Sequence, residues 1–236
     1  MKAEGVESLY PFLYAVDSDL DAVLAEVRRS TVEKATEIVA LRRRLAEEQG
    51  ERLAACAAEM AGRFAAGGRL LTFGNGGSST DAADVAQLFL QPRTGRPLPA
   101  FCLGSTVAVL TALSLAADPT VVTGIAGRVG FAEVFAHQLR QLADPVDIAL
   151  GVSADGHCAN VGRGLEEAHS LGLLTVALAG GDGGRLAHSA AVDHLVVVRS
   201  DDPEVVKEVH VTTYHVLWEL VHVFFEHPGV LEGADR

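Results

Sequence analysis

Residues 69–80 read Arg-Leu-Leu-Thr-Phe-Gly-Asn-Gly-Gly-Ser-Ser-Thr, a short apolar run that ends in a turn rich in glycines and hydroxyls. Apolar residues at helical spacing follow over 81–90. Glycines allow a tight turn that brings backbone N–H groups close to an anion, and Ser78 can bind that anion or cap the helix. The stretch therefore predicts a strand, a ligand-binding turn and a helix, although a serine-capped turn without a ligand would have the same pattern.

The same cycle of strand, turn and helix recurs along the chain. Continuous apolar strands that alternate with helices indicate a parallel sheet covered on both faces. We therefore expect an α/β fold, a three-layer sandwich around a five-stranded parallel sheet. The further predicted strands are 99–103, 147–152, 173–178 and 194–198, and further helices are expected over 159–170 and 203–226.

The chain is expected to contain one α/β domain with a helical N-terminal extension. Apolar residues at helical spacing over 19–67, with charges between them, predict a pair of helices that packs on another element or another subunit. The Glu-Glu-Gln-Gly stretch at 47–50 is the expected break between the two helices. The segments are an N-terminal arm (1–18), the N-terminal helices (19–67), the α/β domain (68–227) and a C-terminal tail (228–236).

The composition argues against several classes of function. The 236-residue chain has a net charge of −12 and no basic cluster that could follow a phosphate backbone, so no direct nucleic-acid partner is expected. Its three cysteines are scattered, which favours a reducing compartment. No apolar run reaches the roughly 20 residues of a membrane span, and the N-terminus has no apolar signal core. We therefore expect a cytoplasmic protein without a membrane partner.

Three polar turns follow predicted strands and would meet at the carboxyl edge of the sheet, where ligands bind in such folds. They cover 74–80, 153–158 and 180–184. The motif Gly74-Asn75-Gly76-Gly77-Ser78-x-x-Asp81-Ala82, the two later turns and Lys207-Glu208-Val209-His210-x-x-x-x-His215 together resemble the sugar isomerase (SIS) domain family over about residues 30–226.

Within that family, the chain is most similar to the sedoheptulose-7-phosphate isomerase (phosphoheptose isomerase) branch and its non-isomerase relative, the initiator-associating protein. The resemblance implies a flavodoxin-like fold, a sugar phosphate or related anionic small molecule as ligand, and a homotetramer with the N-terminal helices at its core. It implies Asp118 and His215 as catalytic residues. It also implies a substrate site made of Asn75, Gly76, Gly77, Ser78, Asp81, Ser153, Asp155, Gly156, Cys158 and Lys207.

The resemblance also implies a zinc site, but this chain departs from the pattern. Asp84 stands where the branch has a metal-binding histidine, and Leu88 stands where it has the catalytic glutamate. Lys207 replaces a glutamine ligand, and a cationic lysine opposes a divalent ion. No metal cofactor is therefore expected, and Asp84 and His215 are the residual candidate ligands.

The second loop departs as well. Ser153 and Gly156 are kept, whereas Asp155 replaces a hydroxyl residue and would repel a phosphate by on the order of a kcal/mol. Arg128, Lys207 or His157 could offset that repulsion. The segment 119–129 is expected to be an insertion near the site.

The sequence is compatible with three functions. The first is a phosphosugar-binding protein with altered or lost isomerase activity, because a leucine at position 88 cannot act as a base. The second is an active aldose–ketose isomerase. The third is a non-catalytic oligomeric regulator that binds a protein partner. An altered chemistry that uses Asp84, Asp155, Cys158, Lys207 and His215 is a variant of the first.

Overall fold

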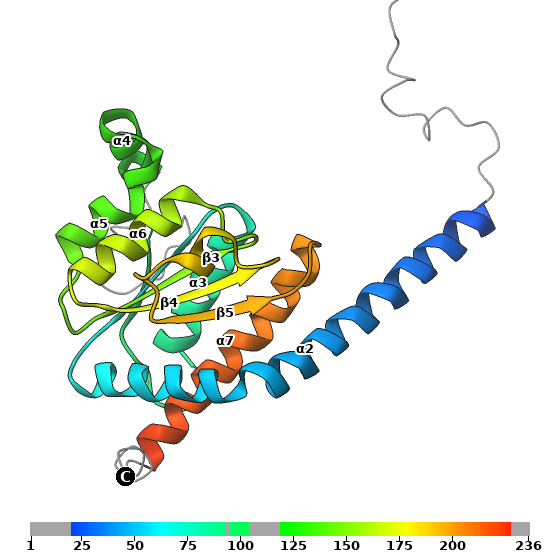
Figure 1. Cartoon of the computed structure of the whole chain (residues 1–236), viewed down its shortest axis with the longest axis horizontal. Coiled ribbons are helices and arrows are strands. Elements are labelled where there is room, and N and C mark those ends of the chain that lie inside the picture. The colour runs from blue at the N-terminus through cyan, green and yellow to red at the C-terminus, as the bar shows by residue number, and fades with distance from the viewer. Residues whose placement is uncertain (1–19, 93–94, 104–118, 228–236) are drawn as a thin grey trace, which may run out of the picture. The chain divides into compact units, whose positions relative to one another are not determined.

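The computed structural model describes residues 20–92, 95–103 and 119–227. Within these ranges the chain forms a parallel sheet with the strand order β2-β1-β3-β4-β5. Figure 1 labels β3, β4 and β5 of this sheet. The expected α/β class and parallel sheet are confirmed. The strands are β1 (Leu70–Gly74), β2 (Ala100–Leu103), β3 (Ile148–Ser153), β4 (Leu174–Gly180) and β5 (His194–Val198).

The strand order has a switch point that locates the ligand edge. The chain winds outward from β1 in both directions, so the loops after β1 and β3 flank a crevice at the carboxyl edge of the sheet. The helices are α2 (Leu20–Ala65), α3 (Gly77–Leu90), α4 (Pro119–Val129), α5 (Val134–Leu142), α6 (Ala159–Ser170) and α7 (Pro203–Glu226), with 3-10 turns η2 (Phe131–Glu133) and η3 (Gly184–His188).

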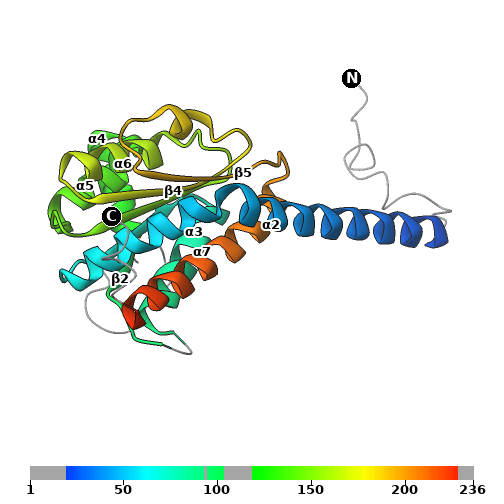
Figure 2. The same cartoon turned by 60° about the horizontal axis from the view of Figure 1, so that its bottom comes forward.

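The central strands β1, β3 and β4 are buried along their whole length, so both faces of the sheet need cover. On one face, Phe73 of β1 packs against Phe135 of α5, with ring centroids 5.0 Å apart, and Leu165 of α6 belongs to the same buried cluster. Helices α3 and α7 pack side by side away from that cluster (Figure 2). The ring of Phe89 on α3 stacks on Phe64 of α2 at 5.7 Å.

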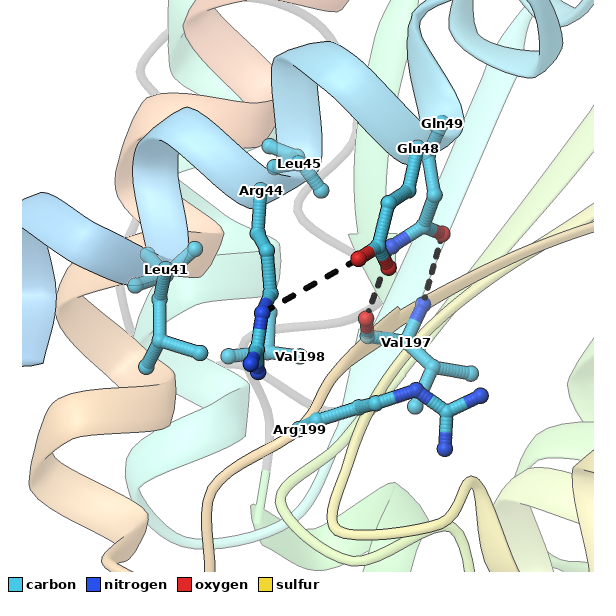
Figure 3. Close-up of a pocket in the computed structure, with 9 residues that line it drawn as sticks. Leu41, Arg44, Leu45, Glu48, Gln49, Val197, Val198 and Arg199 are labelled. Carbon is cyan, nitrogen blue, oxygen red and sulfur yellow. Dashed lines mark hydrogen bonds and ion pairs between the residues drawn. The ribbon is translucent and has the colours of Figure 1, made fainter.

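Polar side chains of α2 form hydrogen bonds with the backbone of the edge strand β5. The Gln49 amide donates to the Val197 carbonyl at 2.9 Å and accepts from the Val197 N–H at 3.2 Å (Figure 3). Arg52 donates to the Leu195 carbonyl at 3.0 Å. An open strand edge carries unpaired N–H and C=O groups, and here the amide of Gln49 takes the place of a neighbouring strand.

The pair of helices expected over 19–67 is a single helix, α2, in the structure. Glutamate and glutamine favour helix, and Gly50 costs only about 1 kcal/mol relative to alanine inside one. Leu45 and Leu53 are buried on either side of the stretch, and their packing outweighs that cost. In the part of the chain that the structure describes, no helix has the length and apolar composition of a membrane span.

A buried carboxylate ties together the segments that lead into β1 and β3. Asp147 accepts hydrogen bonds from the Arg69 N–H at 2.8 Å, the Arg69 guanidinium at 2.6 Å and the Asp144 N–H at 2.9 Å. Its side chain is 1% exposed, whereas that of Asp144, which also pairs with Arg69 at 3.0 Å, is 72% exposed.

We expect Asp147→Ala to lower the free energy of unfolding by about 3 kcal/mol, because it leaves buried donors without an acceptor. The matched variant Asp144→Ala should cost less than about 1 kcal/mol, as exposed ion pairs do. Urea unfolding of both variants tests this, and equal losses would contradict it.

Candidate functional site

A cavity of about 190 Å³ lies at the carboxyl edge of the sheet, between the start of α3 and the first turns of α7. We call it the α3–α7 cavity. The loop after β1 forms one wall, α7 forms another, and the loop after β3 contributes one residue. Its lining residues are Asn75, Gly77, Ser78, Asp81, Ala154, Pro203, Glu204, Val206, Lys207 and His210.

The loop after β1 forms a turn of the kind that binds anions, and we call it the anion-binding turn. Gly76 has φ +52°, a conformation that favours glycine, and precedes the first residue of α3. The N–H of Ser78 donates to the Asn75 carbonyl at 2.9 Å and closes the turn. Gly77 begins α3, so its N–H has no intrahelical acceptor and the positive end of the helix dipole lies beside it. This turn can bind a phosphate or carboxylate.

Lys207 of α7 reaches across to the same turn. Its ammonium donates to the Gly77 carbonyl at 3.1 Å, to the Thr80 hydroxyl at 2.9 Å and to the carboxylate of Asp81. The contact joins residues more than a hundred positions apart in the sequence. Lys207, predicted to bind substrate, is therefore brought into the cavity as a cation held by α3.

Asp81 is the buried member of this ion pair, with 2% of its surface exposed. Burial raises the pKa of Asp81 above its ordinary value, and the contact with Lys207 partly offsets this effect. The negative charges of Asp84 and Glu204 raise the pKa of Asp81 further. The cavity therefore combines an anion-binding turn with a carboxylate that depends on one lysine for its charge balance.

Asn75 pairs with Asn160, a residue outside the sequence motifs described above. Its amide donates to the Asn160 side-chain carbonyl at 2.7 Å and accepts from the Asn160 amide at 2.8 Å. Asn160 is buried in the first turn of α6 and also accepts from the Val161 N–H at 3.0 Å. This reciprocal amide pair joins the loop after β1 to the helix after β3, so Asn75 fixes the shape of the turn.

The loop after β3 is closed by its own side chains. The Ser153 hydroxyl accepts from the Gly156 N–H at 3.0 Å and donates to the Asp155 carboxylate at 3.2 Å. Asp155 also accepts from the His157 N–H at 2.9 Å, and it is exposed. Of this loop, Ala154 lines the α3–α7 cavity. Ser153 and Asp155 thus stabilise the loop, and their predicted contact with a ligand stays a prediction.

The glycine-rich turn after β4 supports the loop after β3. A Cβ at Gly180 would lie 2.1 Å from the Ala154 carbonyl oxygen, and one at Gly156, which has φ +71°, would lie 2.0 Å from that of Gly183. Only glycine allows the two loops to pack backbone against backbone at this distance. Asp182 accepts a hydrogen bond from the Gly184 N–H at 2.8 Å, as expected for a turn residue.

Gly156 and Cys158 line a second cavity, of about 290 Å³, on the α6 side of the loop after β3. Arg163 and Arg185 are among its other lining residues. Cys158 precedes the first residue of α6 and makes no side-chain cap. Gly156 and Cys158 thus line a different cavity from Ser78 and Lys207, with which they were expected to form one site.

The residual metal candidates do not form a ligand set. Asp84 and His215 are exposed, and the His215 Nδ1 lies 2.7 Å from the Val211 carbonyl oxygen, to which it donates in one tautomer. Among the described residues, no group of three or more His, Cys, Asp and Glu side chains could hold a metal ion. Protein zinc sites supply three or four such donors, so the residues present do not fit zinc. Asp118, the other predicted catalytic residue, lies outside the described residues.

The structure adds Glu204 and His210 to the cavity. Both lie three positions from Lys207, so the spacing 204-207-210 on one helix face could have indicated them. His210 is 1% exposed, and burial lowers its pKa to about 4, while a backbone hydrogen bond with Ala179 acts against this shift and the charge of Lys207 adds to it. His210 is therefore a neutral group in the wall of the cavity at neutral pH.

Comparisons with known proteins agree with this fold. Residues 35–180 match the SIS domain family. A phosphoheptose isomerase of Nitratidesulfovibrio vulgaris is 34% identical over 210 residues, which cover 87% of this chain and 93% of the relative. A phosphoheptose isomerase of Aquifex aeolicus is 37% identical over 157 residues, 66% of this chain and 75% of the relative. The phosphoheptose isomerase structure from Neisseria gonorrhoeae has a TM-score of 0.71 at 24% identity, and the match covers 83% of this chain and 98% of that one.

A doubly wound parallel sheet with a glycine-rich turn and a helix start at its carboxyl edge is the arrangement at which α/β domains bind ligands. The chain belongs to the SIS domain family. The family resemblance identified in the sequence is thereby confirmed.

The buried His210 predicts a loss of stability in acid. The unfolded chain binds a proton on this histidine near pH 6.5, and the folded chain binds it only near pH 4. Between these values the unfolded state binds more protons, so the free energy of unfolding should fall as the pH decreases, by up to about 3 kcal/mol. Urea unfolding from pH 7.5 to 4 should show this fall in the parent chain and a smaller one in His210→Gln. The exposed histidine variant His215→Gln is the control, and an unchanged fall in His210→Gln would contradict the prediction.

Proposed function

We propose that this chain binds a sugar phosphate in the α3–α7 cavity, with isomerase activity that is altered or lost. The observation that carries the proposal is the anion-binding turn at Gly77 and Ser78, which shares one cavity with Lys207. A phosphate at the start of α3 would accept from a free N–H and from the Ser78 hydroxyl, in the favourable field of the helix dipole. The sugar would extend toward α7.

The change in activity is proposed from position 88. The resemblance assigns the proton-abstracting base to this position, and an aldose–ketose isomerase needs such a base to move a proton between adjacent carbons. Leu88 is apolar and partly buried on α3. The names of the relatives support a phosphosugar as ligand class, and the residue at this position argues against an unchanged mechanism. A homotetramer and a cytoplasmic location remain predictions.

We expect sedoheptulose 7-phosphate to bind to the chain, with an affinity measurable by titration calorimetry, and to raise the unfolding temperature of the chain. Ser78→Ala should weaken binding by about tenfold, the value of one lost hydrogen bond. The control is Ser170→Ala at the far end of α6, where the hydroxyl bonds only the Glu167 carbonyl and the affinity should not change. Conversion of the sugar should be slow or absent by NMR. Absence of binding would refute the proposed ligand, and rapid conversion would refute the altered activity.

A second candidate, an active aldose–ketose isomerase, is favoured by Glu204. Its carboxylate lines the cavity and makes no hydrogen bond or ion pair within the described residues. It lies close enough to Asp81 to affect the pKa of that residue. A carboxylate in this place could accept the proton that Leu88 cannot.

If the parent chain turns the sugar over, Glu204→Gln should lower kcat by about 10²- to 10⁴-fold, as expected for loss of a general base, with little change in affinity. Solvent deuterium incorporation at C1 and C2 of the sugar, followed by NMR, should fall in parallel. Glu208→Gln, an exposed position on the same helix, is the matched control. Equal rates in Glu204→Gln and the control would exclude this role for Glu204.

A further inference from the structure

All three hydrogen-bond donors of the Lys207 ammonium group have acceptors in the protein. A lysine carries three N–H donors, and Lys207 directs them to the Gly77 carbonyl, the Thr80 hydroxyl and the Asp81 carboxylate. The Thr80 hydroxyl in turn donates to the Gly77 carbonyl at 2.7 Å. The positive charge therefore has a fixed position between α3 and α7, beside the turn that would hold the anion.

This charge offsets the buried carboxylate of Asp81. A buried carboxylate without a partner is strongly unfavourable, and it would also repel an anion bound at the neighbouring turn. The other charged residue that lines the cavity, Glu204, is negative, and His210 is neutral at neutral pH. Among the described residues that line the cavity, Lys207 is thus the only cation.

The same residue opposes a divalent metal ion. The resemblance places the metal ligands at positions 84, 88, 207 and 215, where this chain has an aspartate, a leucine, a lysine and a histidine. Leu88 has no donor atom, and Lys207 presents a positive charge. An ammonium at a ligand position repels the ion instead of donating a lone pair to it.

We propose that the Lys207 ammonium, which occupies one of the implied metal-ligand positions, excludes a divalent ion, balances the charge of Asp81 in the α3–α7 cavity and makes ligand binding independent of metal. Because all three N–H donors of Lys207 are bonded within the protein, Lys207 acts by position and not by direct contact with the ligand. It neutralises Asp81 and fixes α7 on the anion-binding turn. The inference rests on the proposed binding of a sugar phosphate in this cavity.

The first test measures the affinity for sedoheptulose 7-phosphate by calorimetry. After dialysis against EDTA and after addition of zinc, the affinity of the parent chain should be the same within about twofold. Lys207→Gln should lower it by about tenfold or more, because Asp81 then has no counter-charge. Lys34→Gln, an exposed lysine of α2, is the matched control and should bind as the parent does.

The double variant Asp81→Asn/Lys207→Gln separates charge balance from direct contact. If Lys207 acts by neutralising Asp81, removal of both charges should restore the affinity to within about threefold of the parent. A double variant as weak as Lys207→Gln would overturn the positional role. An affinity that rises about tenfold with zinc would overturn metal independence while leaving the proposed function intact. Absence of binding under all conditions would refute the proposed function itself.

A second measurement needs no sugar. The triple variant Asp84→His/Leu88→Glu/Lys207→Gln should bind about one zinc ion per chain by elemental analysis, since it supplies a complete donor set with His215. The parent chain and the double variant Asp84→His/Leu88→Glu, which keeps Lys207, should not bind zinc. Zinc in the double variant, or none in the triple variant, would show that the ammonium is not what excludes the metal.

Discussion

Parallel strands buried on both faces constrain the rest of this structure. Such a sheet needs helices on both sides, and the loops that lead into those helices then gather at its carboxyl edge. In this chain the strand order places the loops after β1 and β3 next to each other at that edge. The start of α3 presents the N–H of Gly77 there, and α7 completes the cavity. The position of the candidate site follows from the topology.

The three loops at this edge have different tasks, although all three are polar and rich in glycine or serine. The loop after β1 presents the anion-binding turn, and the Asn75–Asn160 amide pair holds its shape. The loop after β3 is closed by Ser153 and Asp155, and the turn after β4 packs against it through glycine backbone. Residues that a sequence pattern would assign to one ligand therefore divide between the wall of the α3–α7 cavity and the support of a loop.

The charges of the cavity explain why family membership does not settle the chemistry. Lys207 and Asp81 form a buried pair beside the turn, and Glu204 adds a carboxylate in the same wall. The chain also has a leucine at the position that the resemblance assigns to the base. The anion-binding turn is kept, whereas the groups that would act on a bound sugar differ.

The sequence by itself determined the α/β class, the strands, the glycine-rich turn at Gly74–Ser78 and the family, because these depend on local patterns of apolar residues, glycines and hydroxyls. It also located the departures at Leu88 and Lys207. Only the tertiary structure decided what Lys207 contacts, because its partner Asp81 lies 126 positions away in the chain. The same holds for the continuity of α2 across Gly50, where burial outweighed a local helix-breaking pattern. Local sequence patterns predict helices, strands and turns, whereas long-range packing decides which side chains come into contact.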